Sequence, residues 1–73
     1  MPHIDITKEK KGIFAHVLAG AEPGDEIVYH IGESLGGTHK GEAYGAGEAG
    51  LCHLYQRRLH GSVFAYIARK KGA

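Results

Sequence analysis

Apolar and polar positions follow the clearest pattern in the last third of the chain. Segment 51–71 holds two runs of leucine, β-branched and aromatic residues on either side of His60-Gly61-Ser62. A glycine in a gap of this length is typical of a tight turn between antiparallel strands. In the second run, residues 63, 65 and 67 alternate with residues 64, 66 and 68, and both sets are largely apolar. One face of this hairpin is therefore expected to pack on the rest of the chain.

A further strand and a short helix are predicted upstream of the hairpin. Segment 26–31, EIVYHI, alternates as strands do, and apolar residues at positions 13, 14, 17 and 18 have helical spacing. In one alternative, Thr7 caps this helix. In the other, the helix begins only near Gly12, because the three lysines that follow Thr7 are repelled by the positive end of the helix dipole. Gly20 and Pro23 are expected to end it, and EPGD is a turn sequence.

A second helix is expected over residues 39–49, with Thr38 as its cap. Its interior glycines, Gly41, Gly45 and Gly47, each cost ~1 kcal/mol relative to alanine. Tertiary contacts must therefore hold this helix, and Gly50 is expected just after its end.

Residues 1–11 are interpreted as an N-terminal arm, ahead of a single small α+β domain over residues 12–73. Ile4 and Ile6 lie on one side of an extended segment. The arm is either a frayed terminus or an edge strand. In the functional alternative it adds to a partner as a strand, and the two isoleucines fill pockets of that partner.

The order of these elements predicts an α+β fold, a miniature winged-helix-like domain. It would hold two short helices and a small antiparallel sheet of about three strands that ends in a basic β-hairpin. If such a domain read DNA, the helix before the hairpin would enter the major groove. That helix offers Lys40, Glu42, Tyr44 and Glu48, and two carboxylates against one lysine are poorly suited to base edges and phosphates.

Charge is divided unevenly along the chain. Up to residue 48, four lysines stand against eight acidic residues, whereas residues 49–73 hold five basic residues and no acidic one. The overall charge of +1 therefore conceals a basic hairpin on an acidic scaffold. Such a hairpin can bind an acidic protein surface or hold a phosphate backbone without reading sequence.

Length and composition argue against several classes of function. A chain of 73 residues with one cysteine has a small core without a disulfide, and no apolar stretch approaches the ~18 residues of a membrane span. We expect a soluble monomer in a reducing cytoplasm. Substrate pockets usually need several hundred Å³, so we expect no enzyme and no cofactor.

Motifs that could indicate chemistry are incomplete. Gly45, Gly47 and Gly50 match a dinucleotide fingerprint, but the preceding strand, the following helix and the later acidic residue are missing. Close backbone packing explains these glycines better. The six histidines lack the paired spacing of zinc sites and are interpreted as solvated or hydrogen-bonded surface residues. Cys52-His53 suggests a nucleophile only weakly, and a part-buried strand cysteine is the better interpretation.

Several stretches resemble a group of small phage-encoded regulators that bind the host RNA polymerase, of the type found in a lytic Xanthomonas phage. They are MPHIDIT, GDEIVYHIG, the A-Y-x-A-G-x-A-G pattern over residues 43–50, LCHLYQRR and FAYIARK. The resemblance implies an α+β protein that binds the polymerase β and β′ subunits in the host cytoplasm. It also implies that the protein displaces the σ factor, blocks initiation and acts as an antiterminator.

The partner contacts are placed by charge and by the edge-strand argument, not by the resemblance. They are Ile4, Ile6, Lys8, Lys10, Lys11, Arg57 and Arg58. A secondary contact with a nucleic-acid backbone fits the same basic residues. The alternative is a prophage DNA-binding repressor or regulator that uses the basic hairpin as its wing. A third interpretation is an enzyme that uses Cys52 and His53.

Overall fold

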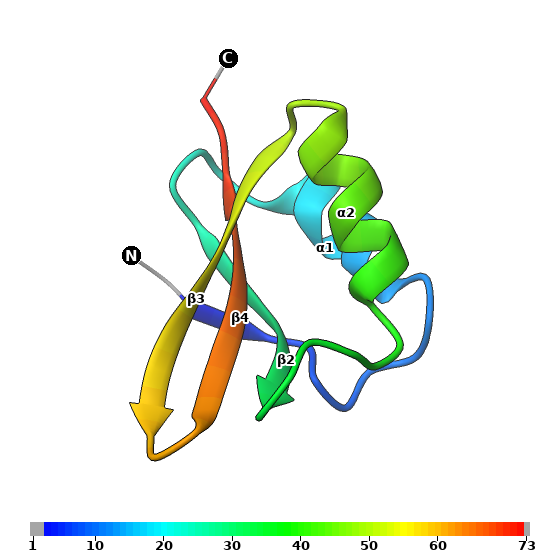
Figure 1. Ribbon diagram of the computed structural model, residues 1–73. Helices are drawn as coiled ribbons and strands as arrows, with labels where there is room; N and C mark the ends of the chain where they lie inside the picture. Colours follow the sequence, from blue (N-terminus) through cyan, green and yellow to red (C-terminus); the bar gives the residue numbers. More distant parts are fainter. Residues whose placement is uncertain (1–2, 73) are drawn as a thin grey trace.

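Two layers make up the protein, a four-stranded sheet and a pair of helices on one of its faces (Figure 1). The computed structural model describes residues 3–72. The predicted α+β class is confirmed. The elements along the chain are β1 (His3–Asp5), α1 (Ile13–Gly20), β2 (Glu26–Gly32), α2 (Lys40–Glu48), β3 (Cys52–His60) and β4 (Val63–Lys70).

The sheet has the order β1-β2-β4-β3. β1 pairs parallel to β2, and the other two pairings are antiparallel. The expected sheet of about three antiparallel strands therefore gains a parallel edge strand, because the chain crosses through α1 between β1 and β2. The winged-helix part of the prediction remains a prediction.

The C-terminal hairpin forms as predicted. β3 and β4 pair from Cys52–Lys70 to His60–Val63, and Gly61 and Ser62 lie between the two strands. Gly61 has a positive φ of 49°, the conformation for which a hairpin turn favours glycine. A bulge lies between Arg58 and His60, close to this turn.

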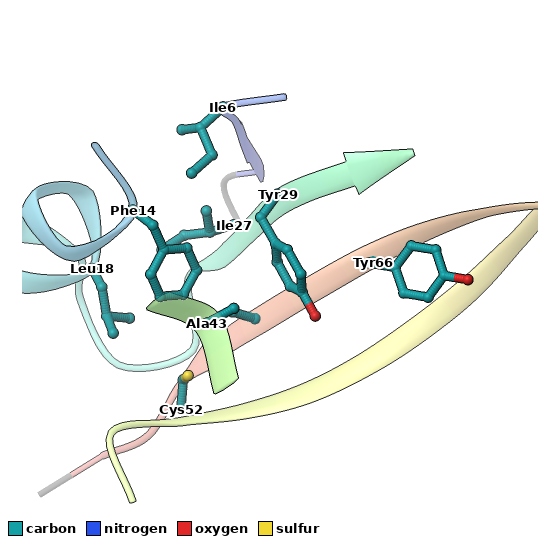
Figure 2. Packing of buried hydrophobic residues seen from close by; sticks show 9 residues of the cluster. Ile6, Phe14, Leu18, Ile27, Tyr29, Ala43, Cys52 and Tyr66 are labelled. Atoms are coloured by element: carbon teal, nitrogen blue, oxygen red, sulfur yellow. The ribbon is translucent and has the colours of Figure 1, made fainter. Parts of the chain in front are cut away.

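The core lies between the sheet and the helices (Figure 2). Phe14 of α1 meets Tyr29 of β2 edge to face, with ring centroids 5.8 Å apart. The other buried members of this cluster are Ile6, Leu18, Ile27, Ala43, Cys52, Tyr66 and Ala68. Helical spacing in α1 and strand alternation in β2 thus bring their apolar sides onto one cluster, as their patterns predict.

The helix ends differ in part from the sequence prediction. α1 begins at Ile13 after Gly12, whose φ is 99°, so the later of the two expected starts is correct. Thr38 does not cap α2. The cap position is His39, which makes no side-chain cap bond and is instead buried, with only 1% of its surface exposed. Its Nε2 donates to the backbone oxygen of Ile6 at 2.9 Å, so His39 connects α2 to the segment after β1.

The end of α2 follows the prediction for Gly50. Gly50 has a φ of 79°, and its N–H donates to the carbonyl of Gly47 at 3.1 Å. The next N–H, of Leu51, donates to the carbonyl of Ala46 at 3.0 Å. These two bonds form a Schellman motif, in which a glycine satisfies the free carbonyls of the last turn.

Candidate interaction surface

A cluster of polar side chains lies on the sheet face opposite the helices, and Glu26 is at its centre. His3 Nε2 is 2.6 Å from Glu26 Oε1, and Arg57 Nη2 is 3.7 Å from the same oxygen. Tyr55 donates its hydroxyl proton to Glu26 Oε2. Arg57 Nη2 also donates to Tyr55 Oη at 3.3 Å. We call His3, Glu26, Tyr55 and Arg57 the Glu26 cluster.

Strand register explains why residues far apart in sequence meet here. His3 of β1 lies beside Glu26 of β2, and Glu26 lies opposite Arg69 of β4. Tyr55 of β3 lies opposite Ile67 of β4, so the bond from Tyr55 to Glu26 passes over β4. Ile67 is only 1% exposed, although it lies on the face away from the helices. We infer that the Glu26 cluster covers Ile67 in place of a third layer.

The electrostatics of the cluster stabilise this arrangement at neutral pH. The hydrogen bond from Tyr55 lowers the pKa of Glu26, and His3 and Arg57 act in the same direction. Burial raises the pKa of Tyr55, and its bond to Glu26 raises it further. A carboxylate therefore faces a protonated phenol, and Arg57 and Arg69 carry positive charge on this face.

The two adjacent arginines expected to bind a partner lie on opposite faces of β3. Arg57 belongs to the Glu26 cluster on the open face. Arg58, the next residue in the strand, points to the other face and donates from Nε to the carbonyl of Gly61 at 2.8 Å. Both are exposed, but Arg58 is part of the hairpin tip and only Arg57 lies on the open face.

The two isoleucines expected to fill pockets of a partner are placed differently. Ile6 is 2% exposed and belongs to the core, and Ile4 is partly buried against it. The reason is that β1 pairs with β2 and turns its apolar side toward the helices. In this fold Ile6 is not available as a surface contact.

Lys8, Lys10 and Lys11 are exposed on the loop between β1 and α1. The loop is held at both ends. Thr7 donates from its N–H and its hydroxyl to Asp5 Oδ1, at 2.9 and 2.7 Å. Gly12 N donates to Glu42 Oε1 of α2 at 3.0 Å. We call residues 8–11 the basic loop.

An apolar groove of about 830 Å³ lies between α1, α2 and the end of β4. The chain is therefore large enough to form an open groove of this size, and the expectation of no enzyme stays a prediction. Small residues on both helices, such as Ala15, Ala19 and Gly45, leave this space. Two of the charged residues that line it are already hydrogen-bonded, Glu42 to Gly12 N and Lys70 to backbone carbonyls. The lining of the groove is therefore mainly apolar, with few polar groups available to a ligand.

The candidate nucleophile and the glycine motif have structural roles. Cys52 is 2% exposed, and burial raises the pKa of its thiol, which opposes activation. His53 is exposed, and strand alternation turns its side chain to the other face. Gly45 and Gly47 lie inside α2, and Gly50 ends it. Residues 3–72 contain no group of three metal-ligating side chains close enough to hold an ion.

These features define a two-layer α+β domain with an uncovered, partly cationic sheet face. No protein-family model, no curated protein and no solved structure matches the chain. Neither helix of the described chain is both long and apolar enough to cross a bilayer. Sequence reasoning missed the roles of Glu26 and Tyr55, because only strand pairing brings them within reach of one another.

Proposed function

We propose that this protein is a phage transcription regulator that binds the host RNA polymerase in the bacterial cytoplasm. It displaces the σ factor to block initiation and acts on elongating polymerase as an antiterminator. The resemblance of the sequence motifs supplies the identity of the partner and the β and β′ subunits as its contacts. The observation that carries a surface-binding role is the open sheet face, where Arg69 lies beside the Glu26 cluster and its Arg57.

Two separate surfaces support binding to a large partner. The basic loop, with Lys8, Lys10 and Lys11, lies on the connection from β1 to α1, whereas Arg57 and Arg69 lie on the sheet. Two weak contacts on one small rigid domain gain affinity through effective concentration. Ile4 and Ile6 support the fold from inside in this proposal, and the arginines and lysines make the contacts.

The alternative, a DNA-binding regulator, has less support from α2. Glu42 on this helix is engaged with Gly12 N, and Lys40 Nζ lies 5.8 Å from the centre of the Tyr44 ring. A groove-reading helix needs free donors for bases and phosphates. A backbone contact through the arginines alone would give affinity that falls steeply with salt.

The test combines polymerase binding with a DNA-shift control. The full chain is expected to bind bacterial RNA polymerase holoenzyme on a sizing column and to release σ. Arg57→Gln with Arg69→Gln is expected to weaken binding at least ~tenfold, whereas Ala19→Glu, at an exposed position of α1 in the α1–α2 groove, leaves it unchanged. Tight binding of one DNA duplex at two salt concentrations, with no binding of polymerase, would contradict the proposal.

A further inference from the structure

The outer edge of β3 carries backbone groups that no strand of residues 3–72 pairs with. β3 is the last strand in the sheet, and its ladder is with β4 alone. In an antiparallel pair, every second residue of the edge strand directs its N–H and C=O away from its neighbour. Such an edge is a template for a further strand.

The usual protection of an edge strand is confined to one end of β3. Proteins protect edges with prolines, bulges, short strands or charged side chains. β3 has no proline, its bulge lies between Arg58 and His60, and its charged residues are Arg57 and Arg58, near the same end. From Cys52 to Arg58 the pairing with β4 is continuous, so this stretch presents a regular edge.

Two hollows follow one another beside β3, next to α2. The first, of about 440 Å³, is bounded by residues 52–54 of β3, and the second, of about 310 Å³, by residues 54–56 together with Tyr29 of β2 and Tyr66 of β4. Tyr44 of α2 lines both hollows, as does Leu54. Figure 1 shows α2 on the helix-covered side of the sheet, and α2 contacts β3 directly.

The spacing of the hollows matches the repeat of a strand. They are displaced by two residues of β3, and side chains on one face of a strand recur every two residues. Alternate side chains of an added strand would therefore enter successive hollows. Tyr44 and Leu54 offer apolar contacts in both hollows, and Leu35 does so in the second. Glu48 and Lys71, of opposite charge, also line the first hollow.

The intervening side chains of an added strand would face the open side of the sheet. There β3 presents His53 and Arg57, and β4 presents Arg69 opposite His53. Glu26 on this face is already bonded to Tyr55 and paired with His3, and Asp5 lies on the same face but on β1, at the opposite edge of the sheet. The charge beside β3 is therefore complementary to acidic side chains.

We propose that β3 accepts an extended segment of a protein partner as an additional strand. The segment alternates apolar side chains, which enter the two α2–β3 hollows, with acidic side chains over the open face. The proposal deepens the proposed function and rests on it only in taking the partner to be a protein.

The test uses the full ¹⁵N-labelled chain and two capped octapeptides, one alternating valine with aspartate and the other valine with lysine. The aspartate peptide is expected to shift and protect the amides of β3 and to bind at least ~tenfold more tightly than the lysine peptide. Equal affinity for both peptides, no binding of either, or shifts confined to the α1–α2 groove would overturn the proposal.

Matched variants locate the bound strand. Tyr44→Glu places a carboxylate in both hollows and is expected to weaken aspartate-peptide binding at least ~tenfold, whereas Ala19→Glu in the α1–α2 groove changes it less than ~twofold. His53→Glu, on the exposed face of β3, is expected to weaken it too and replaces Tyr44→Glu if that variant does not fold. Undiminished binding by a folded Tyr44→Glu or by His53→Glu would contradict strand addition at this edge.

Polymerase binding separates the two proposals. If the chain binds the holoenzyme while β3 amides exchange as in the free protein, strand addition fails and the proposed function stands. If the aspartate peptide binds at β3 but the holoenzyme does not bind, the partner assignment fails and the strand-addition site stands.

Discussion

Glu26 connects three strands of the sheet. It joins β1, β2 and β3 through His3 and Tyr55, and from the burial of Ile67 we infer that this arrangement covers it. A hydrogen bond to a charged group contributes about 1.5–3 kcal/mol. The cluster therefore stabilises the sheet as well as shaping its surface.

The lowered pKa of Glu26 predicts a loss of stability in acid. A carboxyl whose folded pKa lies below its unfolded value stabilises the fold fully above its ordinary pKa of 4.5 and loses that contribution as the pH falls through the folded value. Urea unfolding between pH 7 and pH 2 should show this loss, and Glu26→Gln should flatten it while lowering stability at pH 7 by about 1–2 kcal/mol.

Asp5 is the control for this titration. Its pKa is also lowered, first by the hydrogen bond from the backbone of Thr7, so Asp5→Asn should remove a separate part of the same acid dependence. If Glu26→Gln left the pH profile unchanged, the Glu26 cluster would not exist in solution as described.

His39 is a buried residue that sequence reasoning placed on the surface. Its Nε2 donates to the Ile6 carbonyl, and its Nδ1 has no hydrogen-bond partner among the described residues. His39→Ala should lower the free energy of unfolding by about 2–4 kcal/mol, through the cavity and the lost bond. His16→Ala, at an exposed position of α1, should stay within ~0.5 kcal/mol in the same denaturation experiment.

At the scale of elements, α1 is closed by a side chain from the other end of the chain. Lys70 Nζ of β4 donates to the carbonyls of Leu18 at 2.8 Å and Ala21 at 2.7 Å. The ammonium satisfies free carbonyls and offsets the negative end of the helix dipole. It thus connects α1 to the sheet across a long stretch of sequence.

Lys70→Met keeps the aliphatic stem and removes these bonds, so it should lower stability by about 1–3 kcal/mol. Amide exchange in α1 should accelerate more than exchange in β3. Lys71→Met, the neighbouring substitution, should change stability by less than ~0.5 kcal/mol, and an equal effect of the two would argue against this capping role.

The glycines within α2 and the glycine just after it have different roles. A methyl group at Gly45 would meet nothing within 4 Å, whereas Gly50 has a φ of 79° that other residues adopt with strain. Gly45→Ala should raise stability by about 0.5–1 kcal/mol, and Gly50→Ala should lower it by ~1 kcal/mol. Thermal denaturation of both variants measures these opposite signs, and effects of one sign would contradict the helix boundary.

At the scale of the whole molecule, the N-terminal segment belongs to the fold. Ile6 is in the core, and the bond from His39 holds its backbone. Deletion of residues 1–6 should therefore lower the free energy of unfolding by at least ~3 kcal/mol, from one buried isoleucine and a lost strand. For a marginally stable domain this loss is large.

Replacing Lys8, Lys10 and Lys11 together by Gln is the matched control, because these side chains are exposed on the basic loop. Stability should then change by less than ~1 kcal/mol. Comparable urea midpoints for the deletion and the triple variant would show that the segment does not support the fold. The triple variant is thus the better test of polymerase binding, because a deletion confounds binding with folding.

Local patterns in the sequence determined most elements of this protein. Alternation predicted β2 and the hairpin, the lysine run favoured a start of α1 near Gly12, and Gly50 marked the end of α2. These features depend on short-range sterics and hydrogen bonds, which a sequence displays directly. The uneven charge likewise needs no structure.

Only tertiary structure decided which surfaces exist. Pairing of β1 with β2 placed Ile6 inside, register brought His3 and Tyr55 onto Glu26, and alternation separated Arg57 from Arg58. His39 became a core residue for the same reason. Such contacts join residues distant in sequence, and their energies depend on how whole elements pack, which no local pattern encodes.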